Sequence, residues 1–381
     1  METVSYEDFA RNISHRTSGK RIPLRGTIEV TRRCPLACAH CYNNLPIEDE
    51  QARRSELSFK EHCRIVDEIV EAGCFWLLYT GGEIFARPDF IDIYTYAKQK
   101  GLLITLFTNA VLISEKIADS LAEFPPHFIE ITLYGHTRKT YEKITGKPGS
   151  FERCMRGIRL LRERGMDVKL KTVTMTLNRH EIWEMKRFVE EDLGLEFRFD
   201  AMISPRLDGS QAPLALRLTP EEVVALDLQD SERLSEWNRF CEHHVGPRVG
   251  PKQSHDLYQC GGGIGSFAID PSGNLSLCGM SASDTYDLRQ GNFRDGWEDF
   301  LSSVRQKRIT RKTKCVACEI KAMCGMCPAN GELENKDPEE PVDFLCRVAH
   351  LRAHELGLTV PPHGDCEYCK IHSQTTELVF P

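Results

Sequence analysis

Sixteen cysteines in a chain of 381 residues are the groups in this sequence best suited to chemistry. Three of them, Cys34, Cys38 and Cys41, fall within eight positions in the stretch EVTRRCPLACAHCYNN. Two cysteines would suit a redox pair and four would suit a closed zinc site, whereas three leave one position of a metal centre open. An open position is a reactive one, so the spacing indicates a catalytic centre, with a partial zinc site as the alternative.

A second group of cysteines lies in the last third of the chain and consists of Cys260, Cys278, Cys315, Cys318, Cys324, Cys327, Cys346, Cys366 and Cys369. The remaining ones stand alone, and we expect small buried hydrophobic side chains at Cys63, Cys74, Cys154 and Cys241. Because disulfides are disfavoured where thiols are kept reduced, this excess indicates metal or cluster ligation. Pairs of cysteines with two residues between them, C-x2-C, are also the signature of a zinc ribbon.

The composition is that of an ordinary globular protein, with 41% hydrophobic and 28% charged residues. A formal net charge of -7 argues against a general nucleic-acid binder, which normally has a basic domain. No apolar run reaches the roughly 18 residues of a membrane span, and the N-terminal stretch METVSYEDFARNISHRTSGKR has no signal-peptide core. We therefore expect a cytoplasmic protein with no nucleic-acid partner and no membrane span.

Strands and helices alternate through the first half of the chain. Helical patterns lie between the strand-like runs, and the first of them has Ser58 as N-cap with Glu61 three positions later, as in a capping box. Six such repeats predict parallel strands joined by right-handed crossovers. Since a full barrel has about eight units, we predict an α/β fold with a partial (β/α)6 TIM-like barrel. The strand-like runs cover residues 24–31, 75–80, 102–108, 127–134, 168–175 and 195–202.

The predicted barrel spans residues 24–205 and follows an N-terminal extension of residues 1–23. Residues 206–255 are expected to form a connecting segment with a polar helix. Residues 256–350 form a cysteine-rich domain in which DPSGN predicts a hairpin turn between two strands. Residues 351–381 are expected to be a C-terminal tail.

In parallel barrels the chemistry sits at the C-terminal ends of the strands. The first predicted strand is followed by the three cysteines, the second by TGGEIF with Gly81, Gly82 and Glu83, and the third by Asn109. The stretches LYGHTRKT and KTVTMTLN lie at the ends of the fourth and fifth. These polar and glycine-rich stretches should therefore meet at one rim of the barrel.

C-x3-C-x2-C followed by the glycine-glycine-glutamate stretch resembles the radical S-adenosylmethionine (SAM) superfamily. The resemblance implies that Cys34, Cys38 and Cys41 ligate a 4Fe-4S cluster whose open iron binds the amino and carboxylate groups of SAM. In this family SAM is then cleaved to a 5′-deoxyadenosyl radical that abstracts a substrate hydrogen. Carried over to this chain, the family's cofactor-binding positions are His40 near adenine, Gly81, Gly82 and Glu83 at the methionine ammonium, Asn109 near the ribose or carboxylate, and Lys171 and Thr172 in the same pocket.

The C-terminal cysteines resemble the SPASM extension of radical SAM enzymes, which carries two auxiliary iron-sulfur clusters, of the 4Fe-4S type. The resemblance implies one cluster on Cys315, Cys318, Cys324 and Cys346 and another on Cys260, Cys278 and Cys327. This chain departs from the family in having two residues between Cys324 and Cys327, where three are usual, and no further cysteine soon after Cys260. The second cluster is therefore expected to have an iron open to substrate, to another side chain or to water. Cys366 and Cys369 fall outside the pattern and could supply the missing ligand, form a redox pair or be idle tail thiols, the last being favoured.

The resemblance implies an enzyme that modifies a ribosomal peptide or protein, a peptide maturase. Its partners would be a peptide or protein substrate, an external electron donor and a separate leader-peptide-binding protein. We expect Tyr134, after the fourth strand, to face the radical. The alternatives are a tetrapyrrole-modifying enzyme or a sulfatase-maturing one, the latter disfavoured because Gly279 and Met280 follow Cys278 where sulfatase maturases have an aspartate. A zinc-binding scaffold without turnover is the alternative of another class.

Overall fold

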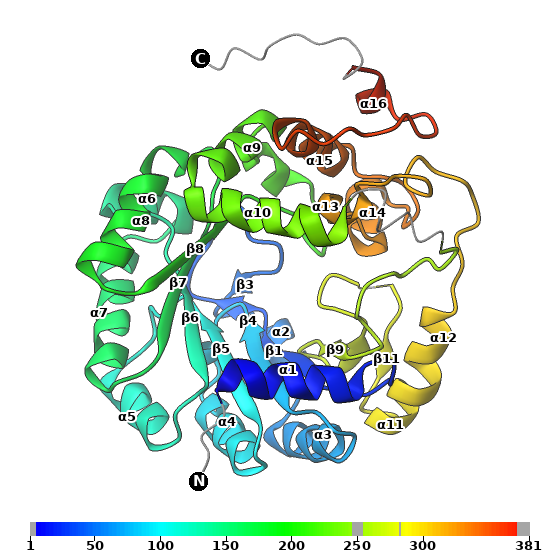
Figure 1. Cartoon of the computed structure of the whole chain (residues 1–381). Coiled ribbons are helices and arrows are strands. Elements are labelled where there is room, and N and C mark those ends of the chain that lie inside the picture. The colour runs from blue at the N-terminus through cyan, green and yellow to red at the C-terminus, as the bar shows by residue number, and fades with distance from the viewer. Residues whose placement is uncertain (1–4, 246–253, 282, 372–381) are drawn as a thin grey trace.

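The structure is a computed structural model that describes residues 5–245, 254–281 and 283–371. Its core is a nine-stranded sheet with the order β11-β10-β9-β1-β4-β5-β6-β7-β8 (Figure 1). Neighbouring strands from β1 to β8 are parallel in this order, so the predicted partial (β/α)6 barrel is confirmed. Its six strands are β1 (Arg25–Thr31), β4 (Trp76–Gly81), β5 (Leu103–Thr108), β6 (Phe128–Thr132), β7 (Val168–Val173) and β8 (Glu196–Asp200).

Helices connect the barrel strands and cover the outer face of the sheet (Figure 1). The capping box predicted at Ser58 is present, because the Ser58 hydroxyl accepts from Glu61 N and the Glu61 carboxylate accepts from Ser58 N. Apolar residues at alternate strand positions, such as Leu77, Ile104 and Leu170, are buried against these helices. The connecting helices are α3 (Phe59–Glu71), α4 (Phe90–Gln99), α5 (Glu115–Glu123), α6 (Arg138–Thr145), α7 (Ser150–Glu163) and α8 (Ile182–Arg187).

The cysteine-rich region extends the barrel sheet, which the sequence did not predict. β9 (Ser266–Ile269) runs parallel to β1, with Arg25 opposite Ser266 and Ile28 opposite Ile269. The predicted hairpin is present, since β10 (Asn274–Ser276) pairs antiparallel with β9 and is followed by β11 (Tyr286–Asp287). The turn is held by Asp270, whose carboxylate accepts from the backbone N–H groups of Ser272 and Asn274. The segment after β10, which holds Cys278, passes close to β1, since a Cβ on Gly279 would lie 3.9 Å from Glu29 Oε1.

The expected connecting segment is more regular than predicted. It contains a 3₁₀ turn, η4 (Ala212–Leu216), and two helices, α9 (Pro220–Gln229) and α10 (Ser231–His244), while residues 246–253 lie outside the described residues. Asp227 of α9 is buried and binds Arg352 of α15 (Asp343–Glu355) at 2.6 Å and Arg233 of α10 at 2.5 Å. This shared carboxylate ties the segment to the cysteine-rich region.

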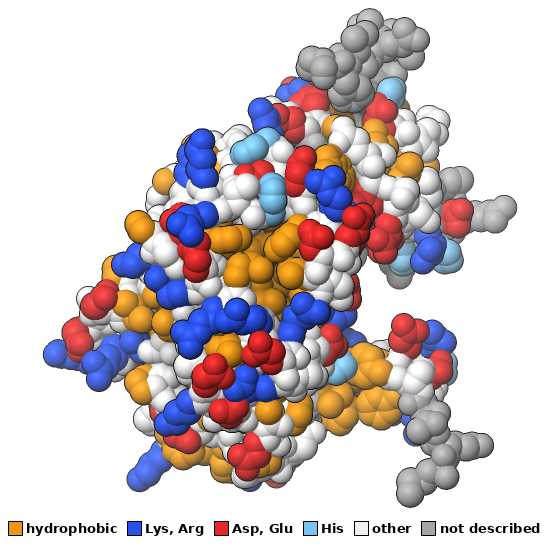
Figure 2. Space-filling view, turned by 90° about the vertical axis from the view of Figure 1, so that its left-hand side faces the viewer, with side chains coloured by type: hydrophobic (Ala, Val, Ile, Leu, Met, Phe, Trp, Pro, Cys, Tyr) orange, Lys and Arg blue, Asp and Glu red, His pale blue; other side chains and the backbone are white. Residues whose placement is uncertain are grey.

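The N-terminal extension forms a helix, α1 (Tyr6–Thr17), that lies across one end of the barrel (Figure 1). Its Phe9 contacts Phe75 and Trp76, and Trp76 Nε1 donates to the Tyr6 hydroxyl at 3.0 Å. Figure 2 shows the side of the molecule that carries α6, α7 and α8, with charged side chains of both signs and a mid-height recess where hydrophobic side chains gather. Among the helices of the described segments, none is long and apolar enough to cross a membrane.

Candidate metal centre

The three N-terminal cysteines lie on a loop that begins as β1 ends. Cys34 belongs to the short strand β2 (Arg33–Cys34), which pairs with β3 (Leu45–Pro46). The loop is docked on the end of α6 by two backbone hydrogen bonds, from Ala37 N to Thr145 O at 2.8 Å and from Ala39 N to Ile144 O at 3.2 Å. Cys34 and Cys38 are buried and Cys41 is partly buried. The backbone therefore places the three thiols together at the rim, as the sequence predicted.

Burial dominates the ionisation of these thiols. It raises the pKa of Cys34 to about 12, and it also raises the pKa values of Cys38 and Cys41. Repulsion from the negative charge of a Cys41 thiolate raises the pKa values of Cys34 and Cys38 further. Asn109, after β5, donates from Nδ2 to Cys34 Sγ at 3.4 Å. Thiols whose pKa is raised in this way stay protonated at neutral pH, so a metal would have to displace their protons on binding.

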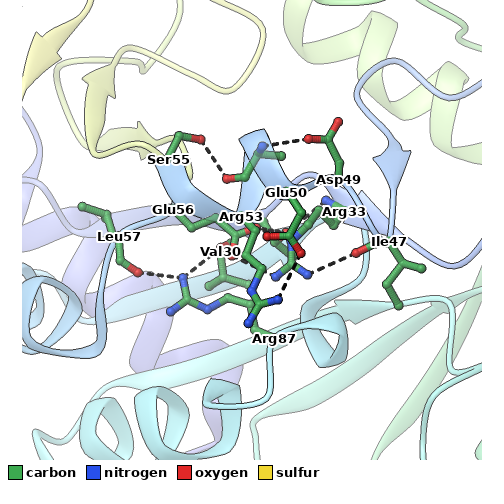
Figure 3. A network of polar contacts seen from close by, with 12 residues as sticks. Val30, Arg33, Ile47, Asp49, Glu50, Arg53, Ser55, Glu56, Leu57 and Arg87 are labelled. Carbon is green, nitrogen blue, oxygen red and sulfur yellow. Dashed lines mark hydrogen bonds and ion pairs between the residues drawn. The ribbon is translucent and has the colours of Figure 1, made fainter.

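A buried ion pair supports the start of the loop (Figure 3). Arg33, directly before Cys34, donates to both carboxylate oxygens of Glu56 at 2.8 and 2.9 Å and to Ile47 O at 3.3 Å. Arg87 approaches from the other side and donates to Val30 O at 3.3 Å and to Leu57 O at 2.8 Å. Bidentate pairing of a guanidinium with a carboxylate fixes orientation as well as position.

Gly81 and Gly82 make close contact with the cysteine loop rather than with an open space. Gly82 N donates to Thr31 O at 2.7 Å, and Gly81 has φ +144°, a conformation that favours glycine. A Cβ on Gly82 would lie 2.5 Å from the Arg32 carbonyl oxygen and 2.6 Å from that of Arg33. The glycines therefore allow the ends of two strands to meet. This packing explains why glycine is needed at positions 81 and 82, in addition to the expected approach of a ligand.

Glu83 is held by hydrogen bonds from within the protein. Its carboxylate is fully buried and accepts from Thr108 Oγ1 at 2.7 and 2.9 Å, from Asn109 N at 2.8 Å and from Phe85 N at 3.2 Å. Burial raises its pKa to about 7 against these hydrogen bonds. The side chain thus links the ends of β4 and β5 and positions Asn109, and its expected contact with the methionine ammonium stays a prediction.

His40 and Tyr134 pack together beside the cysteines. Their rings meet edge to face with centroids 5.0 Å apart, and the Tyr134 hydroxyl is hydrogen-bonded to Cys38. His40 Nδ1 is buried and has no hydrogen-bond partner within the described part of the chain, and burial lowers its pKa to about 4. Tyr134 therefore lies against the cysteine loop, and its expected position facing a radical stays a prediction.

Lys171 and Thr172 do not share one surface. Neighbouring strand residues point to opposite faces, and here Lys171 forms an ion pair with Glu130 beneath the ring of Phe107. Thr172 is buried on the other face, where Asn178 Nδ2 donates to its hydroxyl at 3.4 Å. The two side chains therefore point to opposite faces of β7, and their expected place in one SAM pocket stays a prediction.

A cavity of about 240 Å³ lies between the barrel and the β9–β10 hairpin, and sequence reasoning missed it. Its polar lining includes Glu29 of β1, Arg32 and Asp270. Glu29 is buried and accepts from the Tyr42 hydroxyl at 3.1 Å and Asn43 Nδ2 at 3.0 Å; burial raises its pKa. A carboxylate inside the strand-like run TIEV was the signal that could have revealed it. The lining also contains Leu207, Ala268, Ile269, Asn274, Ser276, Gly279, Ser281 and Thr285.

The structure brings together both predicted sets of C-terminal cysteines. Cys260, Cys278 and Cys327 interact electrostatically with one another. The other set surrounds a small enclosed space, and a cavity of about 520 Å³ that touches both sets lies between them. That other set consists of Cys315, Cys318, Cys324 and Cys346.

Cys366 and Cys369, for which the sequence favoured idle tail thiols, are buried. They are 1% and 4% exposed, on and just before the short helix α16 (Glu367–Ile371). Their sulfur atoms lie with ring nitrogens of His350 and His363 in a group whose atoms are all within 4.8 Å of one another. Residues 372–381 of the expected tail lie outside the described residues.

Comparison with known proteins identifies the barrel. Residues 28–189 match the family model of the radical SAM superfamily, and the match contains the three-cysteine loop, the glycine motif and Asn109. Residues 28–189 form a radical SAM domain. This radical SAM enzyme is 25% identical over 332 residues to the AdoMet-dependent heme synthase of Methanosarcina barkeri, covering 82% of this chain and 94% of that protein.

Two further relatives are informative. Over 354 residues the chain is 28% identical to mycofactocin maturase MftC of Mycobacterium tuberculosis, covering 87% of this chain and 88% of that protein. Among solved structures, Streptococcus suis SuiB bound to precursor peptide SuiA has a TM-score of 0.67 at 18% identity and covers 91% of this chain and 82% of that one. Because this likeness extends through the cysteine-rich region, the chain shares the SPASM-type fold.

The residues present fit the cofactors of this superfamily, a 4Fe-4S cluster and SAM. The donor set at the rim is three buried thiols, which leave one iron of such a cluster without a protein ligand. The unpartnered His40 Nδ1 and the glycine motif lie beside them. The C-terminal cysteines likewise suit auxiliary iron-sulfur clusters, since thiolates are the usual ligands of such clusters.

Proposed function

We propose that this enzyme uses SAM-derived radical chemistry to modify a side chain of a ribosomal peptide or protein. In the proposal Cys34, Cys38 and Cys41 hold the SAM-binding cluster, and Gly81, Gly82 and Asn109 lie along the SAM. The bound cluster and SAM supply the abstraction of a hydrogen atom. The residues of this chain exclude water, orient the substrate and accept the proton that is released when the substrate radical loses one electron, for which an auxiliary iron-sulfur cluster would be the acceptor.

The cavity between barrel and hairpin is the observation that carries the substrate class. Pockets for drug-sized ligands measure about 300–1,000 Å³, and a tetrapyrrole belongs at the upper end of that range. The 240 Å³ cavity suits one amino-acid side chain better than a macrocycle. It also carries Glu29 and Asp270 with Arg32 as the cation between them, at 3.4 Å from Glu29 and 3.7 Å from Asp270. Two carboxylates in such a place would repel the carboxylates of a tetrapyrrole.

Glu29 is the proposed proton acceptor in this cavity. Burial raises the pKa of its carboxyl group. The pKa is then closer to the pH of the reaction than that of an exposed glutamate, so the carboxylate is a better base. Tyr42 and Asn43 orient the carboxylate from the same loop that carries Cys41. A loop residue at the metal centre thus fixes the base relative to the chemistry.

The relatives support a peptide substrate and also keep a second candidate. Mycofactocin maturase MftC and SuiB, whose structure holds a precursor peptide, are maturases or peptide binders by name. The heme synthase of Methanosarcina barkeri favours a tetrapyrrole substrate as the alternative, because it aligns over 82% of this chain.

The deciding experiment uses protein purified without oxygen and reconstituted with iron and sulfide. We expect 5′-deoxyadenosine from SAM with a strong reductant, and none from the Cys34/Cys38/Cys41→Ala variant. A peptide encoded beside this gene and an iron coproporphyrin are then offered in parallel, and products are identified by mass spectrometry. Modification of the peptide alone supports the proposal, and turnover of the porphyrin alone overturns it in favour of the alternative.

A further inference from the structure

We propose that His350, His363, Cys366 and Cys369 form a structural zinc site directly beside the proposed cluster on Cys315, Cys318, Cys324 and Cys346, with its own set of four ligands. The four residues come from α15 and from the segment that follows it, and all four are buried. Neither the radical SAM model nor the seven-cysteine pattern includes Cys366 or Cys369. The site does not depend on the proposed substrate.

The distances between the donor atoms are those of a tetrahedral site. Cys369 Sγ lies 3.3 Å from His350 Nε2 and 3.2 Å from His363 Nδ1, and Cys366 Sγ lies 3.5 Å from His350 Nε2. Around a tetrahedral zinc with Zn–S of about 2.3 Å and Zn–N of about 2.0 Å, neighbouring donors are roughly 3.3–3.8 Å apart. The side chains thus already stand close to the separations that a zinc ion requires.

His350 has the hydrogen bond that orients a metal-binding imidazole. Its Nδ1 lies 2.7 Å from the carbonyl oxygen of Cys346, one helical turn earlier, so Nδ1 carries the proton and donates it. Nε2 then presents its lone pair to the two sulfurs. His363 Nδ1 lies 3.0 Å from Pro361 O, so while that bond is kept Nδ1 is the donor and Nε2, 3.9 Å from Cys369 Sγ, is the nitrogen left for the metal.

The choice of zinc follows from the donors and their burial. Two thiolates and two neutral imidazoles around Zn²⁺ carry no net charge, so the group can be buried without an unpaired charge. Tetrahedral S₂N₂ sites select zinc, whereas auxiliary 4Fe-4S clusters normally use four thiolates. Four protein ligands leave no open position, which makes the site structural rather than catalytic.

The position of the site suggests what it stabilises. Cys346, proposed as a ligand of an auxiliary cluster, lies four residues before His350 on α15. Tyr368 of α16 also ties this helix to its surroundings, because its hydroxyl donates to Asp343 at 2.5 Å and its ring contacts His350 and Lys314. A zinc ion would therefore fasten the segment after α15 over the helix that carries Cys346.

The test is made on the full chain with its clusters in place, purified without oxygen from cells supplied with zinc. We expect about one zinc per chain by mass spectrometry of the metals. The X-ray absorption spectrum at the zinc edge should show two sulfur neighbours at about 2.3 Å and two nitrogen neighbours at about 2.0 Å. Because this spectrum is specific for zinc, the iron of the clusters does not interfere. The measurement is made on the wild-type protein, so its result does not depend on whether a variant folds.

Variants then separate this site from the clusters. In Cys369→Ser and in His363→Ala we expect zinc to fall at least tenfold while iron content and 5′-deoxyadenosine production stay unchanged, and the segment around residues 356–362 to become more sensitive to protease. Cys63→Ser, on α3 and outside both cysteine groups, is the matched control and should keep its zinc. Loss of about four irons in Cys369→Ser would overturn the proposal and assign the thiol to a cluster. Absence of zinc from the wild type, or a disulfide between Cys366 and Cys369, would overturn it as well.

Discussion

Glu29 and Glu83 are both buried carboxylates near the cysteine loop, and burial raises the pKa of each. Their surroundings differ, however. Glu83 has donors on both oxygens from β5 and from its own turn, whereas Glu29 borders a cavity. At the scale of single residues we therefore assign Glu83 to positioning and Glu29 to contact with substrate.

Replacement of Glu29 by glutamine tests the proposed proton acceptor. Glutamine keeps the shape and can hydrogen-bond Tyr42 and Asn43, but it cannot accept a proton. We expect product formation to fall about 10²–10⁴-fold, the usual contribution of a positioned base. Iron content and 5′-deoxyadenosine release without substrate should stay at the wild-type level. Equal product formation by Glu29→Gln would remove Glu29 from the mechanism.

The pKa of Glu83 predicts a pH dependence of stability. Its ordinary value is 4.5 and its native value is about 7, so between these pH values the folded protein holds a proton that the unfolded chain has released. Stability from this group is therefore highest below pH 4.5, falls as pH rises to about 7, and stays constant above. The free energy of unfolding of the cluster-free reduced protein can be measured with urea at pH 4.5 and at pH 8. Between these pH values the wild type should lose at most about 3 kcal/mol more of this free energy than Glu83→Gln. A difference between the two proteins that does not change with pH would contradict this prediction.

At the scale of elements, the ends of β1 and β4 are in direct contact through the glycine motif. We expect Gly82→Ala to separate them, since the added Cβ would lie 2.5 Å from a backbone oxygen that has little room to move. Displacement of the rim by about 1 Å should lower SAM cleavage about a hundredfold. The control is Gly265→Ala, whose Cβ would meet only Ile22 O at 3.9 Å. If both variants cleave SAM equally, the close packing of the two strand ends is not needed for activity.

The ion pair between Arg33 and Glu56 is a second contact between elements that supports the cysteine loop. Both side chains are 7% exposed, so Arg33→Ala would leave a buried carboxylate without its partner. We expect a loss of about 3–5 kcal/mol in the free energy of unfolding and a lower iron content. The double variant Arg33→Met, Glu56→Leu should recover most of the stability, because no charge is then left unpaired. Chemical denaturation measures both, and an equal loss in single and double variants would contradict the explanation.

At the scale of the whole molecule, the pairing of β9 with β1 joins the cysteine-rich region to the barrel. It makes the cavity a shared feature, lined by Glu29 from β1 and by Gly279 and Ser281 from the segment after Cys278. The proposed cluster on Cys260, Cys278 and Cys327 therefore borders the proposed substrate site.

This arrangement predicts that Cys278→Ala separates two activities. We expect the variant to lose about four irons, to keep SAM cleavage without substrate and to lose product formation. Iron analysis and product detection on the reconstituted protein provide the measurement. The control is Cys241→Ala, which removes a buried cysteine outside both proposed cluster sets. Full product formation by Cys278→Ala would exclude a part for this cluster in the reaction.

Sequence alone determined the barrel and its metal chemistry. Periodicity located the six strands to within a few residues, because local burial patterns reflect which face of a strand meets the helices. The spacing of Cys34, Cys38 and Cys41 depends only on a short loop, so it could be interpreted without the fold. The two sets of C-terminal cysteines were also predicted as sets, and the structure brings each together.

Only the tertiary structure decided what depends on contacts between distant segments. The pairing of β9 with β1, the direction of the Glu83 side chain and the separation of Lys171 from Thr172 follow from sheet order and strand face. His350 stands outside every motif, and it joins Cys366 and Cys369 only because the chain after α15 folds back over that helix. Spacing along the chain predicts ligands that are near neighbours in sequence, whereas ligands brought together by folding become visible only when the distances between their atoms are known.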